Sequence, residues 1–206
     1  CFAPLAMPTW VNPKSSESRF GMEPNRLSAL CALLANDPVR LEALAAVAAL
    51  TLPDGWIGAG FVRDAVWDHL HGRLRSPPTG DVDVIWFSRT RADPAIDRDI
   101  EWRLSAVLPK FAWSVKNQAR MHHRNGDRAY ESAADAMMHW PETATAVAAR
   151  LHAGTVEINA PFGLDDLFAL RLRPTPAFVG ERRAIFDGRV ASKQWLKRYP
   201  MLTIPS

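Results

Sequence analysis

Apolar residues recur at helical spacing near the start of the chain, at Leu27, Leu30, Cys31 and Leu34. Residues three and four apart share one face of an α-helix, so this stripe predicts an amphipathic helix over 26–35. The polar residues between them would face solvent. The helix therefore needs a partner on its apolar side.

Asn36, Asp37 and Pro38 interrupt this pattern and predict the start of a second helix that runs to about Leu50. Asp37 is expected as the N-cap, because its side chain can accept hydrogen bonds from the first free N–H groups of the helix. Pro38 suits the first helical position, where its missing N–H is not needed. We expect the two helices to form an antiparallel pair that buttresses a sheet.

The stretch 55–87 has a different pattern, which predicts two strands around a helix. A short strand over 56–59 leads into a tight glycine turn and a helix over 61–70. A polar loop with prolines, 72–80, then joins the helix to a second strand over 81–87.

The rest of the chain continues to mix the two kinds of element. Alternating residues predict strands over 111–119 and 155–160, and cap and stop signals predict helices over 94–108, 132–139, 163–172 and 189–199. The Ala-rich segment 144–151 fits a helix or a strand, and periodicity does not decide between them.

Five of the eight tryptophans fall on positions that these elements turn toward a core. They are Trp56, Trp67, Trp86, Trp102 and Trp113. Large aromatic side chains contribute most to a core by packing, so we expect packing rather than base stacking for most of them.

Strands interleaved with helices predict an α+β fold, a mixed β-sheet flanked by helices with an N-terminal helical pair. Residues 1–24 lack the basic start and apolar block of a signal peptide, and we interpret them as a disordered leader or an artificial extension. Residues 25–206 are predicted to form one domain, with a helical buttress over 25–52, a catalytic core over 55–172 and a basic C-terminal extension over 173–206.

Composition places only weak limits on the partners and the cellular compartment of the protein. Hydrophobic residues make up 48% of the chain, as expected for a folded protein, and the net charge of +3 permits a nucleotide or RNA partner without requiring one. The two cysteines, Cys1 and Cys31, have no metal-ligand spacing, which favours a reducing, cytoplasmic compartment. The longest apolar run, 41–52, contains Glu42 and is too short to span a membrane, so no membrane partner is expected.

Two acids, Asp81 and Asp83, lie one residue apart in the predicted strand 81–87. Side chains alternate along a strand, so both carboxylates share one face, about 7 Å apart. Two carboxylates side by side repel one another unless a cation lies between them, which favours a divalent metal. Upstream, Gly58 and Gly60 end a strand and open a helix, whose first N–H groups would suit a phosphate.

These residues carry a resemblance to a known superfamily. Gly58-x-Gly60-x-x-Arg63-Asp64 followed by Asp81-x-Asp83 resembles the head of the DNA polymerase β-type nucleotidyltransferases, close to the G-G-x-V-R-D and D-x-D signature of tRNA CCA-adding enzymes. The segments 117–122, 141–146 and 160–167 resemble compact bacterial nucleotidyltransferase-like proteins. The similarity runs from about Leu27 to the C-terminus.

The resemblance implies a polymerase β-type fold and nucleotidyl transfer, in which a hydroxyl attacks the α-phosphate of an NTP and pyrophosphate leaves. Asp81 and Asp83 would hold two Mg²⁺ or Mn²⁺ ions, one activating the hydroxyl and one neutralising the triphosphate. The turn Gly58–Gly60, including Ala59, would bind the phosphates. Arg63 could reach those phosphates, or instead pair with a carboxylate and orient the turn.

The superfamily usually adds a third carboxylate on a neighbouring strand, and Glu157 is the best candidate in this chain. Ala59 departs from the family pattern, which has a second glycine or a serine in the turn. Asp64 is expected to be structural, by pairing with Arg63 or capping the turn.

A polar run after the strand 111–119 supplies candidate contacts to a base or to the acceptor, namely Asn117, Arg120 and His122. Loop solvation explains these residues equally well. The C-terminal basic residues Arg182, Arg183, Arg189, Lys193, Lys197 and Arg198 could attract a polynucleotide or form a solvated helix face.

The favoured function is a metal-dependent nucleotidyltransferase with an unidentified acceptor, which could be RNA, a protein or a small molecule. One alternative is a nucleotide- or RNA-binding module that has kept the fold and lost catalysis. Another is a toxin-like transferase that modifies tRNA.

Overall fold

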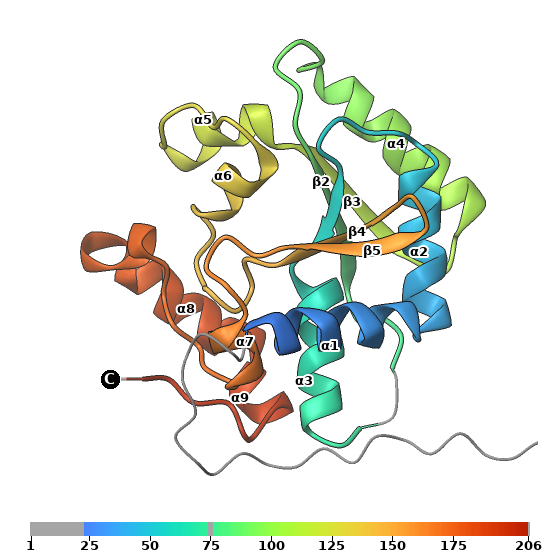
Figure 1. Ribbon diagram of the computed structural model, residues 1–206. Helices are drawn as coiled ribbons and strands as arrows, with labels where there is room; N and C mark the ends of the chain where they lie inside the picture. The colour runs from blue at the N-terminus through green and yellow to red at the C-terminus, as the bar shows by residue number, and fades with distance from the viewer. Residues whose placement is uncertain (1–22, 74–75, 206) are drawn as a thin grey trace, which may run out of the picture.

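The computed structural model describes residues 23–73 and 76–205, with helices on both faces of a five-stranded sheet (Figure 1). The helices are α1 (Glu23–Ala35), α2 (Pro38–Ala48), α3 (Gly60–Leu70), α4 (Pro94–Val107), α5 (Met121–Asn125), α6 (Ala133–Met137), α7 (Asp165–Phe168), α8 (Arg183–Lys193) and α9 (Trp195–Arg198), with 3₁₀ turns η1 (Gln118–Arg120), η2 (Pro176–Phe178) and η3 (Gly180–Arg182). The strands are β1 (Trp56–Gly58), β2 (Asp81–Trp86), β3 (Ala112–Asn117), β4 (Ala148–His152) and β5 (Thr155–Asn159). The predicted α+β class is confirmed.

Most of the predicted leader lies outside the described residues, and α1 already includes Glu23 and Pro24. Within the described ranges, no helix is long and apolar enough to cross a membrane.

The strands lie in the order β3-β2-β1-β4-β5. β2 and β3 pair in parallel through the crossover helix α4, and every other neighbouring pair is antiparallel. A parallel pair requires such a crossover, whereas β4 and β5 are joined by a two-residue turn. β2 and β3 therefore form one side of the sheet and the β4–β5 hairpin the other.

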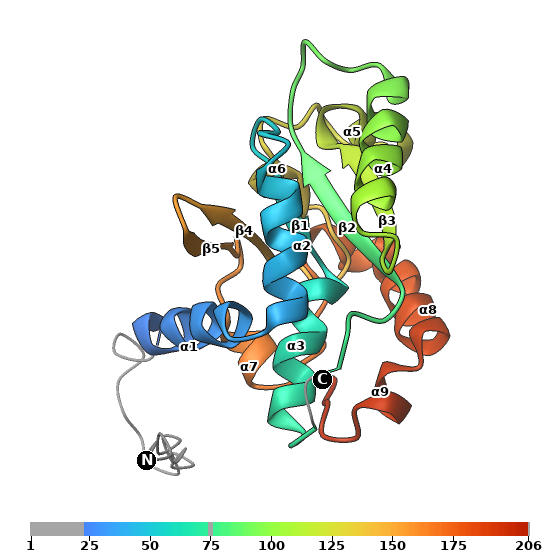
Figure 2. The ribbon, with the colours of Figure 1, turned by 90° about the vertical axis from the view of Figure 1, so that its right-hand side faces the viewer.

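One face of the sheet packs on α1 to α4 and carries the main core (Figure 2). Val82 and Val84 of β2 and Ile57 of β1 are fully buried there, because alternate residues of each strand point to this side. Trp67 of α3 and Trp86 of β2 are also fully buried, as predicted.

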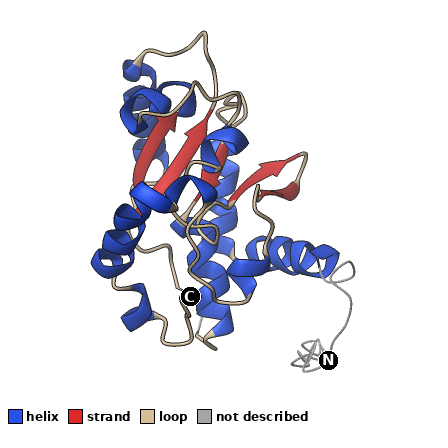
Figure 3. Cartoon of the chain, turned by 90° about the vertical axis from the view of Figure 1, so that its left-hand side faces the viewer, coloured by secondary structure: helices blue, strands red, loops and turns tan. Residues whose placement is uncertain are grey.

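The opposite face is covered by shorter segments, which Figure 3 views from the side of α5, α6 and α8. A smaller apolar cluster joins Trp56 and Ile85 of the sheet to Ala133 and Met137 of α6. Since the small cluster covers only part of this face, polar residues of β2 and β3 remain available to line a site.

The predicted caps are confirmed. Asp37 accepts hydrogen bonds from the first N–H groups of α2, and Pro38 occupies the first turn. The structure also has Asp93 as the N-cap of α4, before the predicted helix 94–108, and Ser132 as the N-cap of α6. These signals are local, because a capping side chain binds backbone two or three residues away.

Several predictions about local structure are wrong or incomplete because tertiary contacts override them. The undecided segment 144–151 is a turn followed by β4, which β1 and β5 flank on both sides. The helix predicted over 163–172 is only α7, since Leu170 has a φ of 54° and its carbonyl accepts a hydrogen bond from Thr203. Trp102, predicted to be in the core, is 70% exposed on α4.

The C-terminal helix also differs from the prediction over 189–199. It starts at Arg183 and breaks at Gln194, where φ is 54°. The break turns Trp195 inward, where it is 3% exposed and packs edge-on against Trp67. Burial of this tryptophan thus explains why one long helix becomes two.

Candidate active site

Asp81 and Asp83 of β2 share one face of the sheet, and Val82 and Val84 between and after them enter the core. Asp81 is exposed and Asp83 is half-buried. Asp81 and Asp83 thus lie on the less covered face, as strand alternation predicts.

The surroundings of Asp83 disfavour its charged form. Burial raises the pKa of the Asp83 carboxyl, and the nearby charge of Asp81 raises it further. Lys193, Arg63 and a hydrogen bond from the Ser114 hydroxyl act in the opposite direction. Ser114 lies directly across the parallel β2–β3 pair from Asp83. The net effect is a raised pKa, and a cation bound next to Asp83 would stabilise its charged form.

The turn after β1 lies beside this acid pair, because Ile57 pairs with Val84 and the chain then turns into α3. Ala59 has φ 53° and ψ −123°, a conformation that residues other than glycine rarely adopt. Its N–H donates to Val147, and its carbonyl accepts from the N–H of Val62 and of Arg63. α3 has no side-chain cap, so its first N–H groups stay available to a ligand.

The two glycines of the turn have packing reasons of their own. A Cβ on Gly58 would lie 2.9 Å from Cη2 of Trp140, so a glycine lets that ring approach the strand. A Cβ on Gly60 would lie 3.3 Å from Nη2 of Arg63. Close approach at both positions therefore accounts for the spacing Gly58-x-Gly60.

Arg63 holds the turn in place through contacts with Asp64, Trp67 and Trp195. Its Nε and Nη2 donate to Oδ1 of Asp64 at 2.9 and 2.6 Å, and its guanidinium lies between the rings of Trp67 and Trp195. Nη1 reaches Oγ1 of Thr145 at 3.4 Å. Only 7% of Arg63 is exposed. Of the two roles expected for Arg63, the structure therefore supports orientation of the turn, and Asp64 has the expected structural role.

A cavity of about 300 Å³ opens on the acid-bearing face. It is lined by Ala59, Asp83, Val84, Ile85, Ser114, Lys116, Gln118, Met121, Arg124, Asn125, Trp140, Pro141, Thr145 and Arg189. The cavity runs from the glycine turn past the half-buried Asp83 to η1 and α5. It joins Ala59 of the predicted phosphate turn to Asp83 of the acid pair, and Asp81 is not part of its lining.

Glu157 does not join this group, contrary to expectation. It lies on β5, and β1 and β4 separate its strand from β2. Its Oε2 accepts from Nε of Arg150 at 2.7 Å, and Arg150 lies over the ring of Trp56. Among the residues that the structure describes, no three His, Cys, Asp or Glu side chains form a metal-binding group. Strand alternation placed Glu157 on the correct face but could not predict its distance from the aspartates.

The three polar residues predicted to contact a base or the acceptor are not in the cavity. Asn117 is fully buried and binds the backbone of Ser88, Arg91 and Ala119. Arg120 pairs with the buried Asp97.

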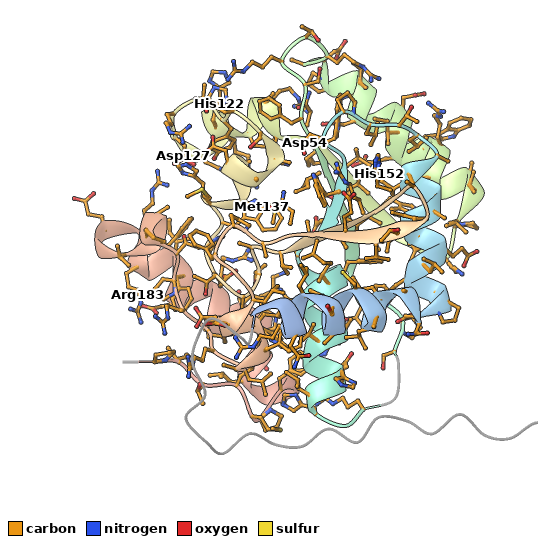
Figure 4. All side chains as sticks on the ribbon, in the orientation of Figure 1. Asp54, His122, Asp127, Met137, His152 and Arg183 are labelled. Carbon is orange, nitrogen blue, oxygen red and sulfur yellow. The ribbon has the colours of Figure 1, made fainter. Side chains whose placement is uncertain are left out.

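His122 is the third of these residues. It stacks on His123 and lies at the outer edge of the α5 region (Figure 4). None of the three residues lines the cavity beside Asp83. Instead, their neighbours Gln118 and Arg124 do.

The basic C-terminal region is largely neutralised by internal pairs. Arg189 binds the fully buried Glu142, with Nε to Oε1 at 2.8 Å, and Arg198 binds Asp64 and Thr79. Arg182 and Arg183 also pair with carboxylates. Lys193, one turn beyond Arg189 on α8, instead places its charge near Asp83. Helical spacing 189–193 is the sequence signal that could have linked α8 to the site.

A family model and a solved structure point to the same family. A family model described as nucleotidyltransferase matches residues 45–204. An NMR structure described as a CCA-adding enzyme head domain is 30% identical, with a TM-score of 0.77 over 87% of this chain and 95% of that chain. A search of curated proteins found no match.

Full CCA-adding enzymes are more distant. The complex of a CCA-adding enzyme with CTP is 16% identical, with a TM-score of 0.54 over 87% of this chain and 43% of that chain. The Thermotoga maritima CCA-adding enzyme in complex with tRNA is 15% identical, with a TM-score of 0.53 over 87% and 42%. These two share the fold, and the present chain spans less than half of their length.

Proposed function

Because the chain belongs to the nucleotidyltransferase family, we propose that it transfers a nucleoside monophosphate from an NTP to a hydroxyl acceptor, with Mg²⁺ or Mn²⁺ bound at Asp81 and Asp83. The acceptor oxygen would bond to the α-phosphorus as the bond to the bridging oxygen breaks. Pyrophosphate leaves, and the hydroxyl proton passes to solvent.

One observation carries the proposal. The acid pair of β2 lies beside the uncapped N-terminus of α3, and one cavity contacts both Asp83 and the Ala59 turn. A triphosphate needs donors for its oxygens and a cation for its charge, and these two features provide both. Arg63 contributes by fixing the turn rather than by contacting the phosphates.

The residues present fit a hard divalent cation. Both acids offer only oxygen ligands, and Asp83 has a raised pKa because burial and Asp81 disfavour its charge. Mg²⁺ is usually held by one or two carboxylates together with substrate phosphates and waters, so two aspartates suffice. When bound, the metal would lower the pKa of the attacking hydroxyl and neutralise the triphosphate.

Backbone and side-chain groups of the protein would bind the phosphates and position the Asp83 carboxylate. The free N–H groups at Gly60 and Phe61 would bind terminal phosphate oxygens, helped by the positive end of the α3 dipole. Lys193 would add a positive charge on the side of α8. Ser114 would hold the Asp83 carboxylate in place through its hydrogen bond.

The test is incubation with each α-³²P-labelled NTP, Mg²⁺ or Mn²⁺, and total cellular RNA and protein. The wild type should label an acceptor, and the Asp81→Asn, Asp83→Asn double variant should lose at least about 100-fold in rate. Asp99→Asn, on the exposed surface of α4, is the matched control and should retain activity. Equal labelling by the double variant would refute the role of the acid pair.

Two further measurements, of NTP binding and of growth on expression, separate the alternatives. Metal-independent NTP binding without transfer to any acceptor would indicate a nucleotide-binding module. Growth arrest on expression, lost in the double variant, would indicate a toxin-like transferase. RNA is the first acceptor class to test, because a related CCA-adding enzyme is complexed with tRNA.

A further inference from the structure

We infer that the end of the cavity formed by η1 and α5 binds the nucleobase of the NTP, with Gln118 and Arg124 contacting the edge of the base. The inference rests on the proposed function, because it takes the phosphate end of the substrate to lie at the Ala59 turn. It adds a base-discriminating site to that function.

The position of the lining residues supports this orientation. Ala59 follows β1 and Asp83 lies on β2, whereas Gln118, Arg124 and Asn125 follow β3, so the lining crosses the sheet from a first end at β1 to a second end beyond β3. A substrate with its phosphates at the first end must extend along the cavity toward the second. The volume of about 300 Å³ is within the range for small-molecule sites.

The second end has the chemistry that a base requires. Gln118 is 5% exposed, and its Nε2 donates to the carbonyl of Lys116 at 3.0 Å, which orients its amide. The amide retains an acceptor and a second donor hydrogen for a ligand.

Arg124 provides the strongest directional contact. Within the described residues its guanidinium has no hydrogen bond or ion pair, although it lines the cavity. Arginine only donates, so it favours a base edge with neighbouring acceptors and disfavours an edge with a donor at the same place. We therefore expect the four NTPs to bind with different affinities.

Hydrogen bonds tie the wall that carries Arg124 to its neighbours, although α5 has only five residues. The Asn125 carbonyl accepts from Arg182, and its side chain donates to the hydroxyl of Tyr130 at 3.1 Å. Tyr130 in turn donates to Asp127 at 2.5 Å, and Arg182 donates to Asp127 at 2.8 Å. Burial, together with the hydrogen bond to Asp127, raises the pKa of Tyr130 to about 12, so this network stays intact at neutral pH.

The test measures binding of ATP, CTP, GTP, UTP and inorganic tripolyphosphate to the full chain by calorimetry with Mg²⁺ and no acceptor. For the wild type we expect at least one NTP to bind about tenfold more tightly than tripolyphosphate, and the NTPs to differ among themselves. Arg124→Ala and Gln118→Ala should each weaken the preferred NTP about tenfold and leave tripolyphosphate within about twofold.

Arg103→Ala, on the outer surface of α4, is the matched control and should change neither affinity. Circular dichroism checks that the variants are folded. Equal affinities for all NTPs and tripolyphosphate would overturn the base site while leaving the phosphate site standing. Binding of neither would overturn the proposed function as well. Normal NTP binding by Arg124→Ala with impaired transfer would assign this end to the acceptor, against the inference.

Discussion

Ala59 is the residue whose replacement tests the strained turn most directly. Its φ of 53° and ψ of −123° lie where a Cβ crowds the backbone, and glycine adopts this conformation without that cost. Hydrogen bonds on both sides, to Val147 and from Val62 and Arg63, hold the peptide groups in place. The residue cannot relax alone, so Ala59→Gly should make the protein more stable.

The magnitude follows from two opposing terms. A non-glycine residue in such a region costs about 1–3 kcal/mol. Glycine makes the unfolded chain more flexible, which costs about 0.4–1 kcal/mol. The net gain in the free energy of unfolding should be about 0.5–2 kcal/mol, which corresponds to a rise in Tm of about 2–6 °C for a domain of this size.

Thermal and urea unfolding of the metal-free protein measure this gain. Ala45→Gly, at an exposed position of α2 with ordinary helical geometry, is the control and should lose about 1 kcal/mol. Ala153→Gly, in the β4–β5 turn with a φ of 47°, should stabilise less than Ala59→Gly, because isolated left-handed residues cost less there. If Ala59→Gly destabilised as much as Ala45→Gly, the turn would not be strained and the reasoning would fail.

Three further predictions concern charge and packing. Burial and a neighbouring carboxylate raise the pKa of Asp83, so the folded state binds the proton of this carboxyl more tightly than the unfolded state does. The metal-free protein should therefore gain stability as pH falls from 7 through this raised pKa toward 3.8, the ordinary value. In melts at different pH, Asp83→Asn should abolish that gain. Glu142→Ala should cost about 1–3 kcal/mol in urea unfolding, because it removes a charge-assisted hydrogen bond from Arg189, whose side chain is 36% exposed and can be solvated in its absence; unchanged stability would contradict this. Gly58→Ala should cost about 1–3 kcal/mol through the 2.9 Å contact with Trp140, and unchanged stability would mean that the ring moves freely.

Local patterns predicted most elements of this fold. The caps at Asp37 and Asp93 could be read directly, because a cap binds backbone within three residues. Alternation along β2 correctly separated the aspartates from Val82 and Val84. The errors fall where distant segments meet, as at Leu170, where a bond from Thr203 ends the predicted helix.

The sequence by itself determined the α+β class, the acid pair on one face of a strand and the glycine turn between a strand and a helix, because these depend on residue spacing along the chain. Only the tertiary structure decided that Glu157 pairs with Arg150 on a distant strand and that Arg63 is buried under the turn. It also brought Gln118 and Arg124 into the cavity in place of their predicted neighbours. The physical reason is that periodicity fixes the direction of a side chain, while the order of strands and the pairing of charges depend on the packing of the whole chain.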